Sequence, residues 1–126
     1  MNSILLVDDD LDLTGLYTEL LEQMGHLITS APNGHAGLAL ARELQPDLII
    51  TDVSMPLMNG LELCRRLRAD ARLRAVPLII HSSEVELLIP RGEAFLPKPC
   101  ELWDFMALVN QLLTDAHAGQ ELASTA

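Results

Sequence analysis

The sequence lacks the features that mark zinc-binding, secreted and membrane-spanning proteins. Its two cysteines, Cys64 and Cys100, lie far apart without a CxxC or Cys/His spacing, so we expect small buried side chains rather than a zinc site or a disulfide. The apolar runs are far shorter than the roughly 18 residues that a membrane span needs. No basic and apolar signal peptide opens the chain. These absences predict a cytoplasmic protein that makes no membrane contact.

Basic charge is scarce as well. Eight basic residues stand against 18 acidic ones, which gives a net charge of −10. Such a field repels phosphate backbones, so direct binding of nucleic acid is not expected. Lysine is the rarest basic residue, since Lys98 is the only one in the chain.

The length allows one domain. With 126 residues, 49% of them hydrophobic, the chain has enough apolar material for one core and too few residues for two. From His117 onward the residues are mostly small and polar, as in a frayed terminus. We therefore predict a folded domain over residues 1–116 and a flexible tail over residues 117–126.

Short apolar runs alternate with longer segments of helical periodicity. This alternation indicates βαβ units, and hence a three-layer α/β sandwich around a parallel sheet. Ligands of such sheets bind at the carboxyl ends of the strands. The predicted strands are residues 4–7, 26–31, 47–51, 77–81 and 94–98, and the last predicted helix covers residues 101–115.

Acidic residues follow two of these strands. Asp8, Asp9 and Asp10 come directly after the first strand, and Asp52 follows the third. Neighbouring parallel strands would bring these carboxylates together, where a hard divalent cation relieves their repulsion. Asp10 and Asp12 have a simpler interpretation as caps of the following helix. The pattern favours a metal site formed by the carboxylates of Asp8, Asp9 and Asp52.

Four motifs in order resemble the receiver domain of two-component response regulators. They are Leu6 to Asp10, Asp52 to Pro56 with Gly60, Ser82, and Lys98 with Pro99. The resemblance covers roughly residues 3 to 114. It implies a flavodoxin-like fold with a five-stranded parallel sheet in the order 2-1-3-4-5. It also implies a phosphoacceptor protein, not an enzyme, that assists only its own phosphorylation and dephosphorylation.

The resemblance assigns a role to each matching residue. Asp52 corresponds to the phosphoacceptor, Ser82 to the switch hydroxyl, and Lys98 to the phosphate-binding lysine. The implied partners are a histidine kinase or a histidine phosphotransfer protein, together with a downstream protein target. The implied cofactor is Mg²⁺, held by Asp8, Asp9, Asp52 and the backbone carbonyl of Ser54.

The interval between Ser82 and Lys98 is about six residues shorter than receivers usually have. Residues 83–92 therefore have room for a fourth helix of at most about one or two turns. This shortening leaves open a second function, a protein-interaction module with a receiver fold that works without phosphorylation. A phosphohydrolase of the haloacid-dehalogenase type is disfavoured, because Ser54 stands where that chemistry needs an acid.

Several other side chains have two interpretations each. Phe95 matches the aromatic switch position of receivers but suits a core position equally. His26 and His81 are expected to be strand histidines with satisfied hydrogen bonds, not ligands. Trp103 lies beside a helix stripe that is already complete, so it either anchors a partner or self-association surface or packs over the shortened connection. That stripe comprises Leu102, Phe105, Met106, Val109, Leu112 and Leu113.

Overall fold

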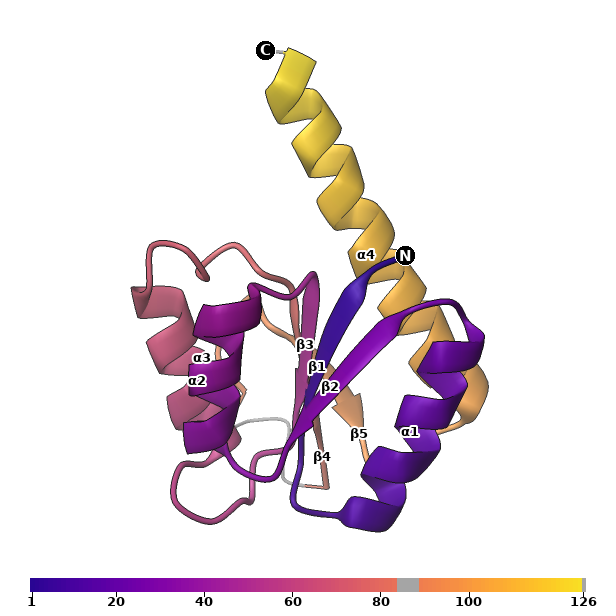
Figure 1. The fold of residues 1–126 in the computed structure, drawn as a ribbon, viewed down its shortest axis with the longest axis vertical. Helices are drawn as coiled ribbons and strands as arrows, with labels where there is room; N and C mark the ends of the chain where they lie inside the picture. The colour runs from indigo at the N-terminus through magenta and orange to yellow at the C-terminus, as the bar shows by residue number, and fades with distance from the viewer. Residues whose placement is uncertain (84–88, 126) are drawn as a thin grey trace.

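A parallel five-stranded sheet forms the centre of the protein (Figure 1). The computed structural model describes residues 1–83 and 89–125. The strand order is β2-β1-β3-β4-β5, which confirms the predicted fold class and order. Each strand lies within two residues of its predicted bounds. The strands are β1 (Ser3–Val7), β2 (Leu27–Ala31), β3 (Leu48–Thr51), β4 (Leu78–Ser82) and β5 (Ala94–Pro97).

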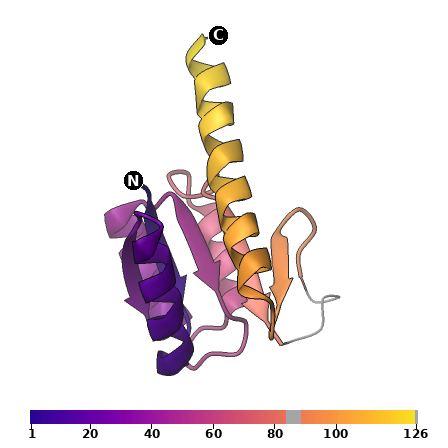
Figure 2. The same cartoon turned by 90° about the vertical axis from the view of Figure 1, so that its right-hand side faces the viewer.

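Helices cover both faces of the sheet. Figure 2 shows α1 and α4 on one face, while α2 and α3 lie on the other. The alternation of side chains along a strand sends β1 residues Ile4 and Leu6 to the first face and Leu5 and Val7 to the second. The sheet is therefore buried on both sides. The described helices are α1 (Leu11–Gln23), α2 (Gly34–Leu44), α3 (Gly60–Ala69) and α4 (Leu102–Thr125).

Local sequence signals set the helix ends. The Asp10 carboxylate accepts a hydrogen bond from the Leu13 N–H and caps α1, which decides between the two predicted capping residues. Asn33 and Asn59 cap α2 and α3 in the same way. Gly25, with a φ of 92°, follows the last turn of α1, because glycine takes this left-handed conformation without strain.

The last helix differs from its prediction at both ends. It continues to Thr125, ten residues beyond the predicted end, so the periodicity of the buried stripe underestimated its length. Leu102 was placed in that stripe but is 44% exposed, because it begins the helix beyond the cover of the sheet. Although α4 has 24 residues, no helix in the described residues is both long and apolar enough to span a membrane. Flexibility of residues 117–126 stays a prediction.

An ion pair anchors the connection between β4 and β5. Arg68 of α3 donates two hydrogen bonds to the Glu93 carboxylate, at 2.7 and 2.8 Å. The same guanidinium donates to the carbonyl oxygens of Arg74 and Val76. The described ends of the connection, Ser83 and residues 89–93, contain no helix. The prediction of at most about one or two helical turns in residues 83–92 depends on residues 84–88, which lie outside the described part of the chain.

Candidate functional site

The loops after β1 and β3 bring three carboxylates together at one edge of the sheet. The backbone N–H of Asp52 donates to the Val7 carbonyl at 2.9 Å, and that of Asp8 donates to the Ala31 carbonyl at 3.0 Å. These bonds continue the strand pairing, so they fix the positions from which the side chains project. One carboxylate oxygen from each of Asp8, Asp9 and Asp52 lies within 4.8 Å of the others. The structure thus brings the predicted acidic residues together.

Backbone donors orient two of these carboxylates. Asp52 Oδ1 accepts from the Val53 N–H at 2.7 Å. Asp8 Oδ1 accepts from the Asp10 N–H at 2.9 Å. Each carboxylate is held through one oxygen, and its other oxygen faces the space between the loops.

The single lysine occupies that space. Lys98 Nζ lies 2.7 Å from Asp8 Oδ2 and 3.2 Å from Asp52 Oδ2. Burial alone would lower the pKa of Lys98, but its hydrogen bond to Asp8 and the charges of Asp8 and Asp52 outweigh burial and raise the pKa above its ordinary value. The ammonium therefore stays charged at neutral pH. Lys98 immediately follows β5, and the Lys98–Pro99 peptide bond is cis.

The donor set suits a divalent cation. Three carboxylates face one ammonium, so the cluster keeps an excess of negative charge when all four groups are ionised. Hard oxygen ligands of this kind are those that Mg²⁺ prefers. Asp9 is the most exposed of the three, which leaves one side of the cluster open. Ser54 is exposed in the loop after β3, and ligation by its carbonyl stays a prediction.

Gly60 lets α3 begin directly against the phosphoacceptor candidate. A Cβ atom at this position would overlap the carbonyl oxygen of Asp52. The Gly60 N–H instead donates to the Val53 carbonyl at 2.9 Å. The glycine in the matching motif is therefore explained by close approach of two backbone segments.

Ser82 and Phe95 lie on neighbouring strands near the lysine. Ser82 ends β4 with 1% of its surface exposed, and its carbonyl accepts from the Lys98 N–H at 3.0 Å. Phe95 is half-buried and packs against the core on the α2 and α3 side. This packing agrees with the core interpretation of Phe95. The switch roles of both residues stay predictions.

A buried polar chain behind the site was not predicted from the sequence. The Tyr17 hydroxyl of α1 lies 2.8 Å from His81 Nε2, and His81 Nδ1 lies 2.8 Å from the Leu96 carbonyl. With the Nδ1 proton donated to that carbonyl, Nε2 accepts from Tyr17. Burial lowers the pKa of His81, which keeps the ring neutral. The sequence indicated only that His81 would be satisfied, and this is confirmed.

The second predicted strand histidine differs. His26 precedes β2, and its buried Nδ1 has no hydrogen-bond partner among the described residues. The prediction of a strand histidine with satisfied hydrogen bonds was therefore wrong for His26, which lies before the strand and leaves Nδ1 without a described partner.

A small cavity separates the polar chain from the carboxylates. Its volume is about 10 Å³, roughly the space that one water molecule needs. Thr14 contributes a buried hydroxyl without a hydrogen-bond partner in the described structure. The polar lining residues are Asp8, Thr14, Tyr17, Thr51, Asp52 and His81.

A larger hollow of about 520 Å³ opens beside the lysine. It combines the Lys98 side chain with leucines from α1 and from the start of α4. Trp103 is 79% exposed, so its ring is not buried by the described residues. The hollow is lined by Leu13, Leu16, Tyr17, Ser83, Lys98, Pro99, Cys100 and Leu102.

Comparison with known proteins agrees with this geometry. Residues 4–110 match the family model described as the response regulator receiver domain. The polar-differentiation response regulator DivK of Brucella anthropi is 33% identical over 90% of this chain and 98% of its own length. The DNA-binding dual master transcriptional regulator RpaA of Synechocystis sp. is also 33% identical, over 90% of this chain. The chain spans about half, 49%, of the length of RpaA.

A solved structure supports the same assignment. The signal receiver domain of a signal transduction histidine kinase from Syntrophus aciditrophicus is 30% identical and superposes with a TM-score of 0.84. The match covers 91% of this chain and 92% of that domain. Response regulator receiver domains are the phosphoacceptor modules of two-component signalling, and this chain belongs to that family.

Proposed function

We propose that Asp52 accepts a phosphoryl group from a phosphohistidine donor, and that Asp8, Asp9, Asp52 and the Ser54 carbonyl hold Mg²⁺ during the transfer. The observation that carries the proposal is the position of Lys98 Nζ, within hydrogen-bond distance of both Asp8 and Asp52. Phosphoryl transfer needs fixed positive charge around the equatorial oxygens and an ionised nucleophile. At this edge of the sheet Lys98 supplies the positive charge, and Asp52 supplies the carboxylate.

Different residues of the chain have different roles in the phosphoryl transfer. An oxygen of Asp52 attacks phosphorus, the P–N bond to the donor imidazole breaks, and an acyl phosphate forms on Asp52. Lys98 pairs with one phosphoryl oxygen, and the Ser82 hydroxyl donates to another once the group has arrived. Mg²⁺ at the three carboxylates would neutralise further phosphoryl charge. The Val53 N–H holds Asp52 in position throughout.

The surface around the hollow suits a protein donor. The leucines of α1 and Leu102 flank Lys98, and Leu16 is 49% exposed. A donor protein that presents its histidine to Asp52 has to cover this edge, where apolar side chains stabilise docking. We infer a histidine kinase or a histidine phosphotransfer protein as this partner, met in the cytoplasm.

The output is a contact with a downstream protein. DivK is named as a response regulator and RpaA as a DNA-binding transcriptional regulator, so similar receivers serve different outputs. A module that works without phosphorylation is supported less, because the acidic cluster and Lys98 lie within contact of one another. We also propose that the chain has no enzymatic activity beyond its own phosphorylation and dephosphorylation.

Labelling with acetyl phosphate tests the phosphoacceptor. Wild type should shift on a phosphate-affinity gel when Mg²⁺ is present, while Asp52→Asn should not. Asp12→Asn is the matched control, because Asp12 is an exposed acid in the first turn of α1. Persistent labelling of Asp52→Asn would show that another residue accepts the phosphoryl group.

Calorimetry tests the cation site separately. Mg²⁺ should bind wild type and Asp12→Ala alike, and Asp9→Ala should bind it at least about tenfold more weakly, because an oxygen ligand is lost. Equal affinity in all three proteins would place the ion elsewhere.

A further inference from the structure

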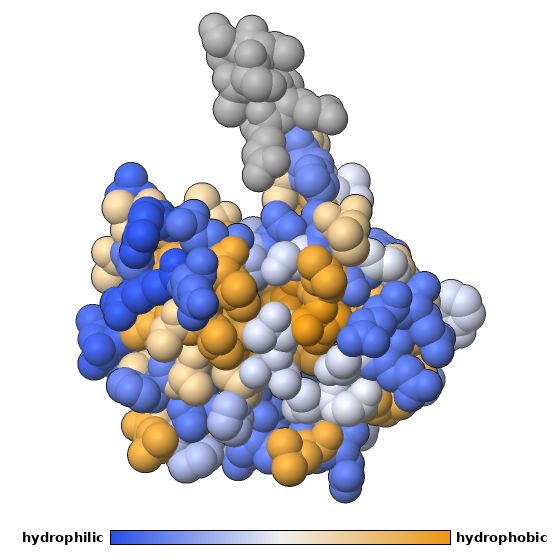
Figure 3. Space-filling view, in the orientation of Figure 1, coloured by the Kyte–Doolittle hydropathy of each residue, from blue (hydrophilic) through white to orange (hydrophobic). Residues whose placement is uncertain are grey.

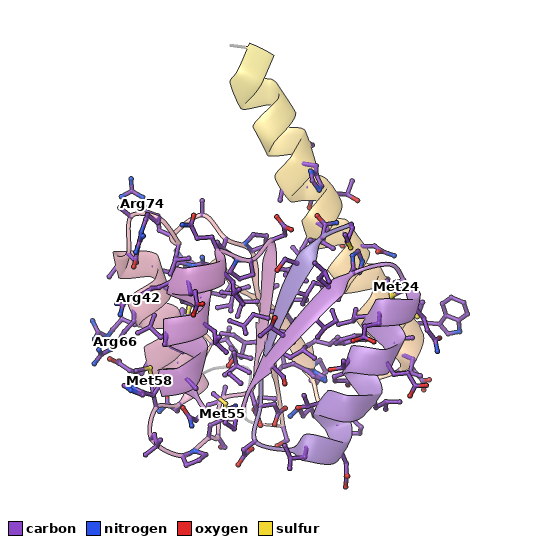
Figure 4. All side chains as sticks on the ribbon, viewed as in Figure 1. Met24, Arg42, Met55, Met58, Arg66 and Arg74 are labelled. Atoms are coloured by element: carbon purple, nitrogen blue, oxygen red, sulfur yellow. The ribbon has the colours of Figure 1, made fainter. Side chains whose placement is uncertain are left out.

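The side of the molecule formed by α2 and α3 is basic, although the whole chain carries a net charge of −10. Figure 4 shows Arg42, Arg66 and Arg74 on this side, away from α1. Strongly hydrophilic colour gathers over the same elements in Figure 3. We propose that this surface binds an Asp- or Glu-rich segment of a partner protein. The arginine surface consists of Arg42, Arg65, Arg66 and Arg72, with Glu62 and Asp70.

On the arginine surface the carboxylates are more buried than the guanidinium side chains around them. The two carboxylates are the inner groups, since the side chains of Glu62 and Asp70 are 35% and 16% exposed. The four guanidinium side chains lie outside them, with exposed fractions of 50% for Arg42, 67% for Arg65, 48% for Arg66 and 61% for Arg72. Four positive groups therefore surround two negative ones, and a partner meets the positive layer first.

Most donor groups of these arginines remain available. Arg65 donates two N–H groups to Glu62. Arg66 donates one N–H to the same carboxylate, and Arg42 donates one to Asp70. Arg72 Nε is 4.0 Å from Asp70 Oδ1, too far for a hydrogen bond. A guanidinium has five N–H donors in a planar fork that matches a carboxylate, so further carboxylates can bind here.

The shape limits the size of the ligand. Arg42, Arg65, Arg66, Ala69 and Asp70 line a hollow of about 440 Å³ between α2 and α3. A short acidic segment can place its carboxylates in this hollow while the rest of its chain leaves the protein. A nucleic acid would extend its phosphates over the acidic remainder of the molecule, which repels them. The charge distribution therefore favours an acidic peptide segment.

Helix stability alone does not account for this arrangement. Arg42, Arg66 and Arg68 lie in the last turns of α2 and α3, where positive charge interacts favourably with the helix dipole. Arg72 lies outside both helices and yet extends the same positive layer. Because the surface lies across the sheet from α1, an acidic partner and the phosphohistidine donor can bind at the same time. This inference is independent of the proposed phosphoacceptor.

A labelled octaglutamate peptide is a direct probe of the arginine surface. Fluorescence anisotropy should detect its binding to wild type at low ionic strength and weaker binding at physiological ionic strength, because exposed charges are screened. Arg66→Gln should weaken binding about fivefold, the effect of losing one exposed ion pair. Glu62 keeps two hydrogen bonds from Arg65 in this variant, so no carboxylate is stranded and the fold should persist.

Arg91→Gln is the matched control. It removes the same charge from an exposed arginine that does not line the hollow, and it should change affinity less than about twofold. Equal losses in the two variants would show attraction by overall charge and overturn the proposal. Absence of octaglutamate binding would overturn it too, as would equally tight binding of an oligothymidine of the same charge. Circular dichroism of each variant confirms that folded proteins are compared.

Discussion

The two faces of the sheet bury different kinds of side chain. The α2 and α3 face is packed mainly with aliphatic residues such as Leu63 and Leu67. The α1 and α4 face contains an aromatic and polar cluster, in which Tyr17 stacks on Phe105 with ring centroids 4.0 Å apart and bonds to His81. Aliphatic packing on the first face holds α2 and α3 against the sheet. The hydrogen bonds on the second face connect α1 to β4, which ends at Ser82, and to β5, which Lys98 follows.

The outer surfaces of the two layers differ as well, but in the opposite sense. Exposed apolar side chains, including Leu11, Leu16, Leu102 and Trp103, lie on α1 and α4. The excess arginines lie on α2 and α3 and in the segment that follows. We therefore expect apolar partner surfaces to bind on the α1 and α4 side of the sheet and charged partner surfaces to bind on the α2 and α3 side.

Alanine variants of one core residue from each face should show what each face contributes to stability and to phosphorylation. These variants should have the largest effect on stability of the changes considered. Phe105 and Leu67 are 0% and 1% exposed, so we expect alanine variants to lose about 3–5 and 2–5 kcal/mol of unfolding free energy. Only Phe105→Ala should also slow phosphorylation per folded molecule, because it removes the ring that supports Tyr17. Urea unfolding and acetyl phosphate labelling measure the two effects. Equal slowing of phosphorylation in both variants would show that the two faces do not differ in their effect on the site.

Tyr17→Phe tests the hydrogen bond within the aromatic cluster. The variant keeps the ring stack but leaves His81 Nε2 buried without its partner, and we expect a loss of about 1–3 kcal/mol. A double-mutant cycle with His81→Gln should show that the two effects are not additive. Additive losses would mean that the hydrogen bond does not couple the two residues.

Lowering the pH should reduce the unfolding free energy through His81, which is buried on the α1 and α4 face. Burial lowers the pKa of His81 in the folded protein, so below about pH 6.5 the unfolded chain binds a proton that the folded chain does not. The unfolding free energy should therefore fall as pH drops from 7 toward the folded pKa, by at most about 1.4 kcal/mol per pH unit for this group.

Comparison of histidine variants isolates the effect of His81. His81→Gln should reduce the slope of unfolding free energy against pH. His26, whose pKa burial also lowers, should supply part of the slope that remains. His35→Gln is the control, because His35 is exposed. An unchanged slope in His81→Gln would contradict the assignment.

Trp103→Ala should have the smallest effect on stability. The side chain is 79% exposed, and a substitution at such a position changes the unfolding free energy by about 0.5 kcal/mol or less. We expect weaker self-association or weaker binding of a phosphohistidine donor, seen by sedimentation with and without phosphorylation. Leu27→Ala, at an exposed leucine of β2, is the control. A large loss of unfolding free energy would instead show that the Trp103 side chain packs against its own chain.

The parts of the fold predicted from the sequence depend on local pattern. Apolar runs located the strands, and the acidic residues that follow two of them located the site. The contact between Tyr17 and His81 joins residues 64 apart in the sequence, and it depends on how α1 rotates against the sheet, which periodicity does not specify. The exposure of Leu102 has a similar origin. Helical spacing identified a stripe, but only the tertiary structure shows where the sheet stops covering it.

The length of α4 has a mechanical consequence. Among the side chains whose burial is described, Leu113 is the last buried one in α4, and His117 makes a 3.1 Å contact with Asn2 near the start of β1. Beyond that contact the helix projects away from the sheet (Figure 1). Twenty-four residues at about 1.5 Å each make a rod of about 36 Å. Because α4 follows the loop that carries Lys98, a rigid tilt of the helix by about 5° about its first residue would move its tip by about 3 Å.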